Sequence, residues 1–170
     1  MRFIKKIDKF LTPIEEYAIT IFLLFMTFIT FWGVVNRFVL KESLSWSEEM
    51  ARYLSIWAAF IGASLGVKKG AHIGVEAFVQ FLPEKAQRYI SIITTVFCII
   101  FCGAIAYIGY GYSLKLISTA QLSPAMRIPI AWAYAAVPVG CALMTLRYVM
   151  VLIEEIVNLK NGMAERGECN

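Results

Sequence analysis

The sequence predicts an all-α integral membrane protein that crosses the bilayer four times within a single membrane domain, residues 1–170. Two observations lead to this class. Of the 170 residues, 59% are hydrophobic and 16% are charged, whereas about 25% of the residues in a soluble domain are charged. Four stretches also contain no charged residue: Tyr17–Asn36, Tyr53–Val67, Tyr89–Leu114 and Ile128–Leu146. These features exclude a secreted disulfide scaffold, a disordered tail and an ordinary cytosolic enzyme.

The lengths of these stretches set the four expected spans. A helix needs about 20 residues to cross roughly 30 Å of hydrocarbon. The first, third and fourth stretches have 20, 26 and 19 residues, and the second has 15. The second helix must therefore include charged residues on one flank. The expected spans are residues 14–36, 45–67, 87–114 and 129–150, followed by a polar tail at 158–170.

The distribution of basic residues predicts the orientation. With the N-terminus inside, inner segments hold 11 of the lysines and arginines and outer loops hold 5. Because basic residues are retained on the cytoplasmic side, we expect both termini in the cytoplasm. The first apolar run is long, and no A-x-A-like cleavage site follows it, so we expect this span to be retained.

Two segments have the pattern of amphipathic helices that lie on the inner membrane surface. Residues 2–11 place apolar side chains on one face and basic ones on the other, although an unstructured basic tail is an alternative. Thr12–Glu15 has the pattern of a capping box with proline at the first helical position, so a new helix is expected to begin there. The inner loop contains a second candidate interfacial helix at 71–82, which Pro83 would end.

Four charged residues flank the short second span, and they form the principal candidate site. Ser45–Glu48 has the pattern of another capping box and predicts the start of this span near Ser45. Helical spacing allows Glu48 or Glu49 to pair with Arg52. Charges at this depth usually face protein, form pairs or extend to the interface. Together with Arg37, they could hold spans together or meet another subunit. Alternatively, they are interface anchors, with Trp46 in the aromatic belt.

Small residues and prolines predict how the spans pack and end. Gly62 and Gly66 lie four residues apart, a spacing that allows two helices to approach closely. Pro124 and Pro129 are expected to break the helix between the third and fourth spans. Pro138 is expected to kink the fourth span.

The residues indicate no catalytic chemistry, so we expect that the chain is not an enzyme. The sequence has no phosphate-binding loop, no His-Glu-x-x-His motif and no nucleophile elbow. The only histidine, His72, cannot supply two axial ligands to a haem. Cys98, Cys102 and Cys141 read as small apolar residues within spans. Basic residues lie at membrane boundaries, so nucleic-acid binding has no support. We expect no cofactor in this chain.

Several motifs together resemble the small membrane subunit of TRAP transporters, the DctQ/SiaQ family. Its most specific block is Ser45-Trp46-Ser47-Glu48-Glu49-Met50-Ala51-Arg52. Further elements precede and follow this block: Asn36-Arg37-Phe38, Trp57, Gly62, His72-Ile73, Leu82-Pro83, Ser123–Pro129, Tyr134, Pro138, Gly140 and Arg147. The resemblance covers approximately residues 10 to 150.

This resemblance implies a role in a three-part transport system of the bacterial inner membrane. A periplasmic binding protein would deliver an organic acid, such as sialic acid or a C4-dicarboxylate, to a complex of a small and a large membrane subunit. The large subunit would carry the sodium and substrate sites, and this chain would be a stator that enlarges the fixed scaffold. Sialic acid is the slightly favoured substrate.

The resemblance also suggests roles for particular residues. Candidates for contacts between helices or subunits are Arg37, Trp46, Glu48, Glu49, Arg52, Trp57, Gly62 and Gly66. Lys41, Lys115 and Arg127 could attract the binding protein electrostatically.

Two alternative functions remain open from the sequence. A small multidrug exporter also has four spans, but it is expected to carry an acid within the membrane, and the first span has none between Glu16 and Arg37. A membrane anchor for a redox complex would need more histidines or a partner that brings the cofactor.

Overall fold

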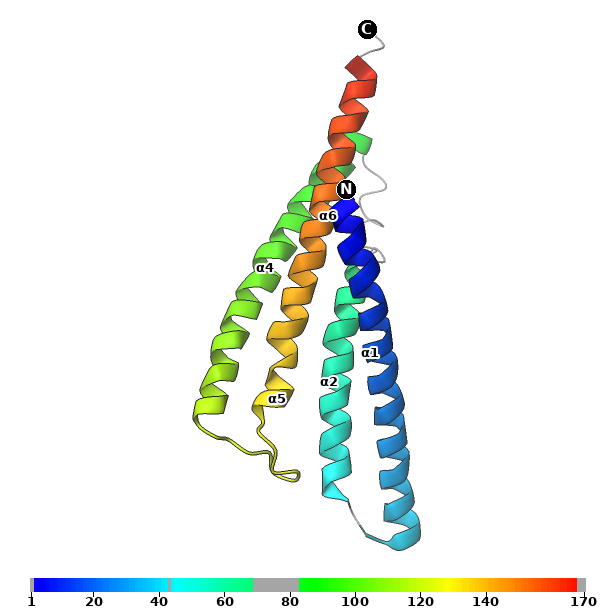
Figure 1. The fold of residues 1–170 in the computed structure, drawn as a ribbon, viewed down its shortest axis with the longest axis vertical. Coiled ribbons are helices and arrows are strands. Elements are labelled where there is room, and N and C mark those ends of the chain that lie inside the picture. The colour runs from blue at the N-terminus through cyan, green and yellow to red at the C-terminus, as the bar shows by residue number, and fades with distance from the viewer. Residues whose placement is uncertain (1, 43, 69–82, 168–170) are drawn as a thin grey trace.

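The structure, a computed structural model, describes all residues except 1, 43, 69–82 and 168–170. Its elements are helices joined by short loops (Figure 1). The elements are α1 (Arg2–Val35), the π-helix η1 (Asn36–Leu40), α2 (Ser45–Lys68), α4 (Glu84–Ser118), α5 (Ala131–Tyr134) and α6 (Ala136–Gly167). The predicted interfacial helix at 71–82, with His72, lies outside the described residues.

Four segments of the described chain are long and apolar enough to cross a membrane. They are Lys6–Leu40, Ser45–Lys68, Tyr89–Ser118 and Ala131–Val157. The predicted all-α membrane class with four spans is therefore confirmed. Helix α4 extends beyond the predicted third span at both ends, and the fourth helix continues through part of the polar segment to Gly167.

The four long helices form an open layer. Helix α1 packs on α2, α2 packs on α6, and α6 packs on α4. Figure 1 shows this order across the molecule, with the start of α1 and the end of α6 at one end and the two connecting loops at the other. The helices at the edges are covered on one side only. Large hydrophobic side chains are consequently exposed along both, among them Phe28 (65%) on α1 and Phe97 (67%) on α4.

Helix α1 continues without interruption through Thr12 and Pro13, which corrects the prediction of a separate helix over residues 2–11. The hydroxyl of Thr12 does not cap a new helix. It donates to the backbone carbonyl of Asp8 at 2.8 Å, one turn earlier. Side chains from α2 and α6 bind this face of α1 on both sides of Pro13, so tertiary contacts support the helix where proline removes one backbone hydrogen bond.

The second and fourth spans begin close to the positions that the sequence predicts. Helix α2 begins at Ser45, as predicted, and the backbone N–H of Ser47 donates to the carbonyl of Leu44 at 3.1 Å. The segment containing Pro124 and Pro129 is a loop, after which α5 begins at Ala131. The helix is interrupted at Ala135, one turn before Pro138. This is the expected place, because proline cannot donate to the carbonyl four residues earlier and crowds it.

Close approaches between helices occur at glycines other than the predicted Gly62. A Cβ added to Gly140 of α6 would lie 2.5 Å from Cβ of Phe60 on α2, and one added to Gly109 of α4 would lie 3.2 Å from Cδ of Pro138. At Gly62 the added Cβ would make an ordinary 3.9 Å contact with Ile19. The α2–α6 and α4–α6 contacts therefore depend on Gly140 and Gly109.

Candidate functional site

A buried ion pair joins the two helices that carry Glu15 and Arg147. Both side chains are only 2% exposed. Nε of Arg147 donates to Oε2 of Glu15 at 3.1 Å, and Nη2 donates to the same oxygen. The other carboxylate oxygen of Glu15 accepts a hydrogen bond of 2.8 Å from the hydroxyl of Ser64 on α2. Three helices therefore meet at a single carboxylate.

A second acid and a second base complete this inner charge network, which we define as Asp8, Thr12, Glu15, Ser64, Lys68 and Arg147. Nη1 of Arg147 lies 3.0 Å from Oδ1 of Asp8, and Nζ of Lys68 lies 2.8 Å from Oδ2 of the same residue. Lys68 also donates to the hydroxyl of Thr12 at 2.8 Å. Two positive and two negative side chains balance one another, so the burial of Arg147 leaves no net charge within the network.

The inner charge network connects helices that are not neighbours in the layer. Because α2 lies between α1 and α6, the long side chain of Arg147 provides a direct link between those two helices. Buried charges are costly when unpaired, but a fully hydrogen-bonded pair specifies one arrangement of the surrounding elements. The network therefore fixes the relative positions of three helices at the end of the molecule that carries both termini.

From the sequence, Arg147 was predicted only as an element of the family resemblance and as one of the basic residues that set the orientation, and this network was not predicted. One signal could have found it. Arg147 is the only charged residue between Ile128 and Ile153, and a lone charge in such a run usually faces protein. On α1, residues 8, 12 and 15 follow helical spacing and so place two acids on one face.

At the opposite end, Glu49 links α2 to the loop between α4 and α5. Its Oε2 accepts hydrogen bonds from the backbone N–H groups of Ala125 at 2.9 Å and Met126 at 3.1 Å, and Oε1 accepts one from the hydroxyl of Tyr53. The loop is also closed internally, because the N–H of Ser123 donates to the carbonyl of Ile128 at 2.8 Å. Glu49 thus holds the loop between the third and fourth spans to the second span, a contact that the sequence did not specify.

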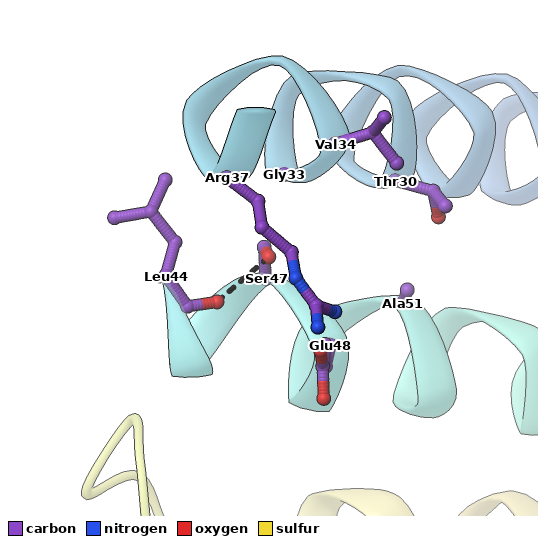
Figure 2. A pocket seen from close by; sticks show the side chains of 8 residues that line it. All are labelled: Thr30, Gly33, Val34, Arg37, Leu44, Ser47, Glu48 and Ala51. Atoms are coloured by element: carbon purple, nitrogen blue, oxygen red, sulfur yellow. Dashed lines mark hydrogen bonds between the residues drawn. The ribbon is translucent and has the colours of Figure 1, made fainter. Parts of the chain in front are cut away.

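The other three members of the predicted boundary cluster are not joined by ion pairs within the described part of the chain. Arg37, Glu48 and Arg52 are exposed. Figure 2 shows the guanidinium of Arg37 pointing toward Glu48 across a pocket between the end of α1 and the start of α2. Helical spacing allows Arg52 to pair with Glu48 or Glu49, but no such ion pair is present among the described residues. Glu49 binds backbone amides, and the side chain of Arg52 is exposed.

The remaining residues proposed for helix or subunit contacts divide into two groups. Trp57 bridges two spans, because its Nε1 donates to the backbone carbonyl of Trp132 at 3.1 Å. Gly62 and Gly66 are half-buried. Trp46 is 40% exposed at the start of α2. Trp46 is therefore available to an interface or to lipid, and Trp57 serves the internal packing.

The candidate docking residues Lys41, Lys115 and Arg127 are all exposed and lie in or beside the two loops at one end of the molecule (Figure 1). Two of these residues have left-handed backbone conformations, with φ of 57° at Lys41 and 53° at Arg127. The structure thus places the three basic side chains at one end, as a common docking role requires.

The described residues offer no obvious place for metal or redox chemistry. Within them, no group of three or more histidine, cysteine or acidic side chains could hold a metal ion. Cys102 and Cys141 are buried, and Cys98 is half-buried. The charged residues of the inner charge network join helices, and Glu49 anchors a loop.

The fold and these contacts define a small multi-pass membrane protein whose described polar groups are mainly structural. A family model places the chain more closely: "Tripartite ATP-independent periplasmic transporters, DctQ component" matches residues 26–158. The chain belongs to this DctQ family. It is therefore a small permease subunit of a TRAP transporter and not an enzyme.

Three relatives illustrate the range of the family. The C4-dicarboxylate TRAP transporter small permease protein DctQ of Vibrio cholerae is 25% identical over 168 residues, which cover 86% of this chain and 72% of the relative. The ectoine TRAP transporter small permease protein TeaB of Halomonas elongata is 28% identical over 89% of this chain and 79% of its own length. The sialic acid TRAP transporter permease protein SiaT of Haemophilus influenzae is 25% identical, over 91% of this chain but only 24% of SiaT.

Proposed function

We propose that this chain is the stator of a TRAP transporter and works with a separate large membrane subunit. The observation that carries this proposal is the match to SiaT. Nearly all of this chain corresponds to about a quarter of that permease. The remainder of SiaT lies outside this match, and we assign its role to the large membrane subunit.

The open layer is suited to such a partner. Helices α1 and α4 each pack on one neighbour and expose rows of large hydrophobic side chains. The inner charge network holds three helices in one arrangement, and Glu49 holds the loop at the other end. A rigid element that adds surface to a moving partner needs these properties. Exposed boundary residues, including Arg37, Trp46 and Arg52, are available for contacts with the large subunit.

The remainder of the proposal concerns the transport cycle. A periplasmic binding protein docks near Lys41, Lys115 and Arg127, and the large subunit moves an organic acid with sodium. Sialic acid and C4-dicarboxylates are the two substrate classes that we favour, with a slight preference for sialic acid. Both termini lie in the cytoplasm and the complex resides in the bacterial inner membrane, so the docking residues face the periplasm.

Reconstituted uptake tests this proposal. The large subunit and binding protein of the same system are expressed with and without this chain, and uptake of labelled sialic acid, succinate and ectoine is measured in sodium and in choline medium. We expect sodium-dependent uptake of one acid only when all three proteins are present. Equal uptake without this chain would contradict a necessary role.

The boundary contacts are tested in the same system. Because Glu49 holds the α4–α5 loop and Arg52 is exposed beside it, Glu49→Ala combined with Arg52→Ala should lower the yield of the complex and the uptake rate. Glu42→Gln, which changes an exposed acid in the neighbouring loop, is the control. Unchanged yield and uptake in the double variant would show that these two residues have no such role.

A further inference from the structure

A pocket of about 300 Å³ lies between the end of α1 and the start of α2, at the end of the molecule that carries the two connecting loops. Figure 2 shows the side chains that line it, including Thr30 and Val34 from α1, Arg37 from η1, and Ser47 and Glu48 from α2. Its volume is at the lower end of the range for small-ligand sites, roughly 300–1,000 Å³. The pocket can therefore admit a headgroup-sized molecule.

The two charged side chains of the pocket face each other but do not form an ion pair. Arg37 points toward Glu48 in Figure 2, and no ion pair joins them within the described residues. The inner charge network is different, because every charged group there is paired at hydrogen-bonding distance. At the pocket, one cation and one anion face each other without forming an ion pair, an arrangement that suits a ligand with both charges.

The backbone around Arg37 supports a specific role for this position. Arg37 lies in the π-helix η1. Turns of π-helix are rare in proteins, and those that occur are often found at functional sites. Nδ2 of the buried Asn36 donates to the carbonyl of Trp32 at 2.9 Å, and Lys41 ends the turn with φ of 57°. These contacts hold the turn that carries Arg37 to the pocket.

The surroundings favour a lipid. The pocket lies where the first span ends and the second begins, which is the level of the headgroups. Val34 lines the pocket and is 49% exposed, and Phe31, one turn earlier, is 65% exposed, so apolar surface for acyl chains adjoins the polar opening. The guanidinium of an arginine can hold a phosphate with two hydrogen bonds, and a carboxylate accepts hydrogen bonds from a primary ammonium.

We propose that this pocket binds the headgroup of a phospholipid that carries a primary ammonium, with its phosphate on Arg37 and its ammonium on Glu48. The hydroxyls of Thr30 and Ser47 donate to the carbonyls of Met26 and Leu44 at 2.7 and 2.8 Å. Their oxygens can still accept hydrogen bonds from the ammonium. A choline headgroup has the same charges but no N–H to donate to Glu48, so the pocket should distinguish the two lipids.

Native mass spectrometry of the full chain, purified with the partners that it retains, tests this proposal. The complex is placed in nanodiscs of equimolar dioleoyl-phosphatidylethanolamine and dioleoyl-phosphatidylcholine, and the lipids that stay bound are counted. The wild type should retain one ethanolamine lipid per chain, preferred about tenfold over choline lipid, the effect of one charge-assisted hydrogen bond. Glu48→Gln should abolish the preference, Arg37→Gln should abolish retention of both lipids, and Arg37→Lys should restore part of it.

Matched controls separate a specific site from general charge effects. Lys9→Gln removes an exposed basic residue at the opposite end of the molecule, and Glu42→Gln removes an exposed acid from the adjoining loop. Neither residue lines the pocket. Both variants should retain the wild-type preference. Equal retention of the two lipids by the wild type would overturn the proposal. An unchanged preference in Glu48→Gln would also overturn it. The same holds if Arg37→Gln loses the partner subunit together with the bound lipid.

Discussion

Arg147 is the residue on which the contact between α1 and α6 depends, because its guanidinium binds both acids of the inner charge network. Replacing Glu15 by alanine leaves this guanidinium buried with only Asp8 as a charged partner. Removal of one member of a buried pair costs about 3–5 kcal/mol. With Asp8 retained, we expect Glu15→Ala to lower the free energy of unfolding by about 3 kcal/mol, at the lower end of that range. The thermal unfolding midpoint in detergent measures it.

Two variants complete this test. Glu16→Ala changes the neighbouring exposed acid and should have little effect on the midpoint. Replacement of both Glu15 and Arg147 by methionine removes the charges together and should recover most of the loss, because a buried pair is often no more stabilising than well-packed apolar residues. Equal midpoints for Glu15→Ala and Glu16→Ala would show that the buried pair does not stabilise the fold.

Glu49 acts on a loop through backbone amides, so its effect should be local. In Glu49→Gln the amide oxygen is a weaker hydrogen-bond acceptor than the carboxylate. The N–H groups of Ala125 and Met126 should therefore exchange with solvent roughly tenfold faster, which corresponds to a loss of about 1.4 kcal/mol in hydrogen-bond free energy. Hydrogen–deuterium exchange of the loop peptide measures this. Glu48→Gln, one residue away and not bound to the loop, should leave exchange unchanged. Faster exchange in both variants would indicate a general effect of charge.

At the scale of helices, the contact between α2 and α6 depends on a glycine. A Cβ at position 140 would lie 2.5 Å from Cβ and 3.2 Å from the backbone carbonyl carbon of Phe60. Since backbone cannot move aside cheaply, Gly140→Ala should destabilise the protein by about 1–3 kcal/mol. Thermal unfolding in detergent measures the change.

Gly103→Ala is the matched control, because an added Cβ at that position meets nothing within 4 Å. Alanine is the better helix former, so this variant should be neutral or stabilised by up to about 1 kcal/mol. A midpoint for Gly140→Ala that equals that of Gly103→Ala would contradict the close packing of α2 on α6.

The helices were largely predictable from the sequence, and their contacts were not. Charge-free runs identified all four spans because a membrane helix must satisfy its backbone internally and exclude charge. Local patterns also located the start of α2 at Ser45 and the break before Pro138. The capping-box pattern at Thr12 was misleading, because contacts from α2 and α6 support α1 on both sides of Pro13.

The candidate site was predicted only in part, for a related reason. Glu49 was identified from its position near the membrane boundary, but its partners lie 76 and 77 residues away in a loop that no local pattern connects to it. The pairing of Glu15 with Arg147 spans 132 residues and depends on the order of the helices in the layer. Sequence periodicity identifies the face of a helix but does not identify the helix opposite it.

At the scale of the whole molecule, the two ends of the layer differ in the use of charge. The end with the termini contains the buried pair of Glu15 and Arg147, and the loop end exposes Lys41, Lys115 and Arg127. Electrostatic attraction chiefly affects the rate of association and is weakened by salt. Changing all three residues to glutamine should raise the binding-protein concentration needed for half-maximal uptake roughly three- to tenfold.

The matched control changes Lys6 and Lys9 to glutamine, because these residues are exposed at the opposite end of the molecule. The difference between the wild type and the triple variant should shrink at high ionic strength. A triple variant with the wild-type dependence on binding-protein concentration would show that these side chains do not attract the binding protein.

The central claim is that this open layer is one part of a larger permease, and purification from native membranes tests it most directly. The tagged chain is extracted in mild detergent, and its stoichiometric partners are identified by mass. We predict recovery of a large multi-span protein at about one to one, as expected for a small permease subunit that works with a large membrane subunit. Recovery of the chain only as a homo-oligomer would contradict the claim.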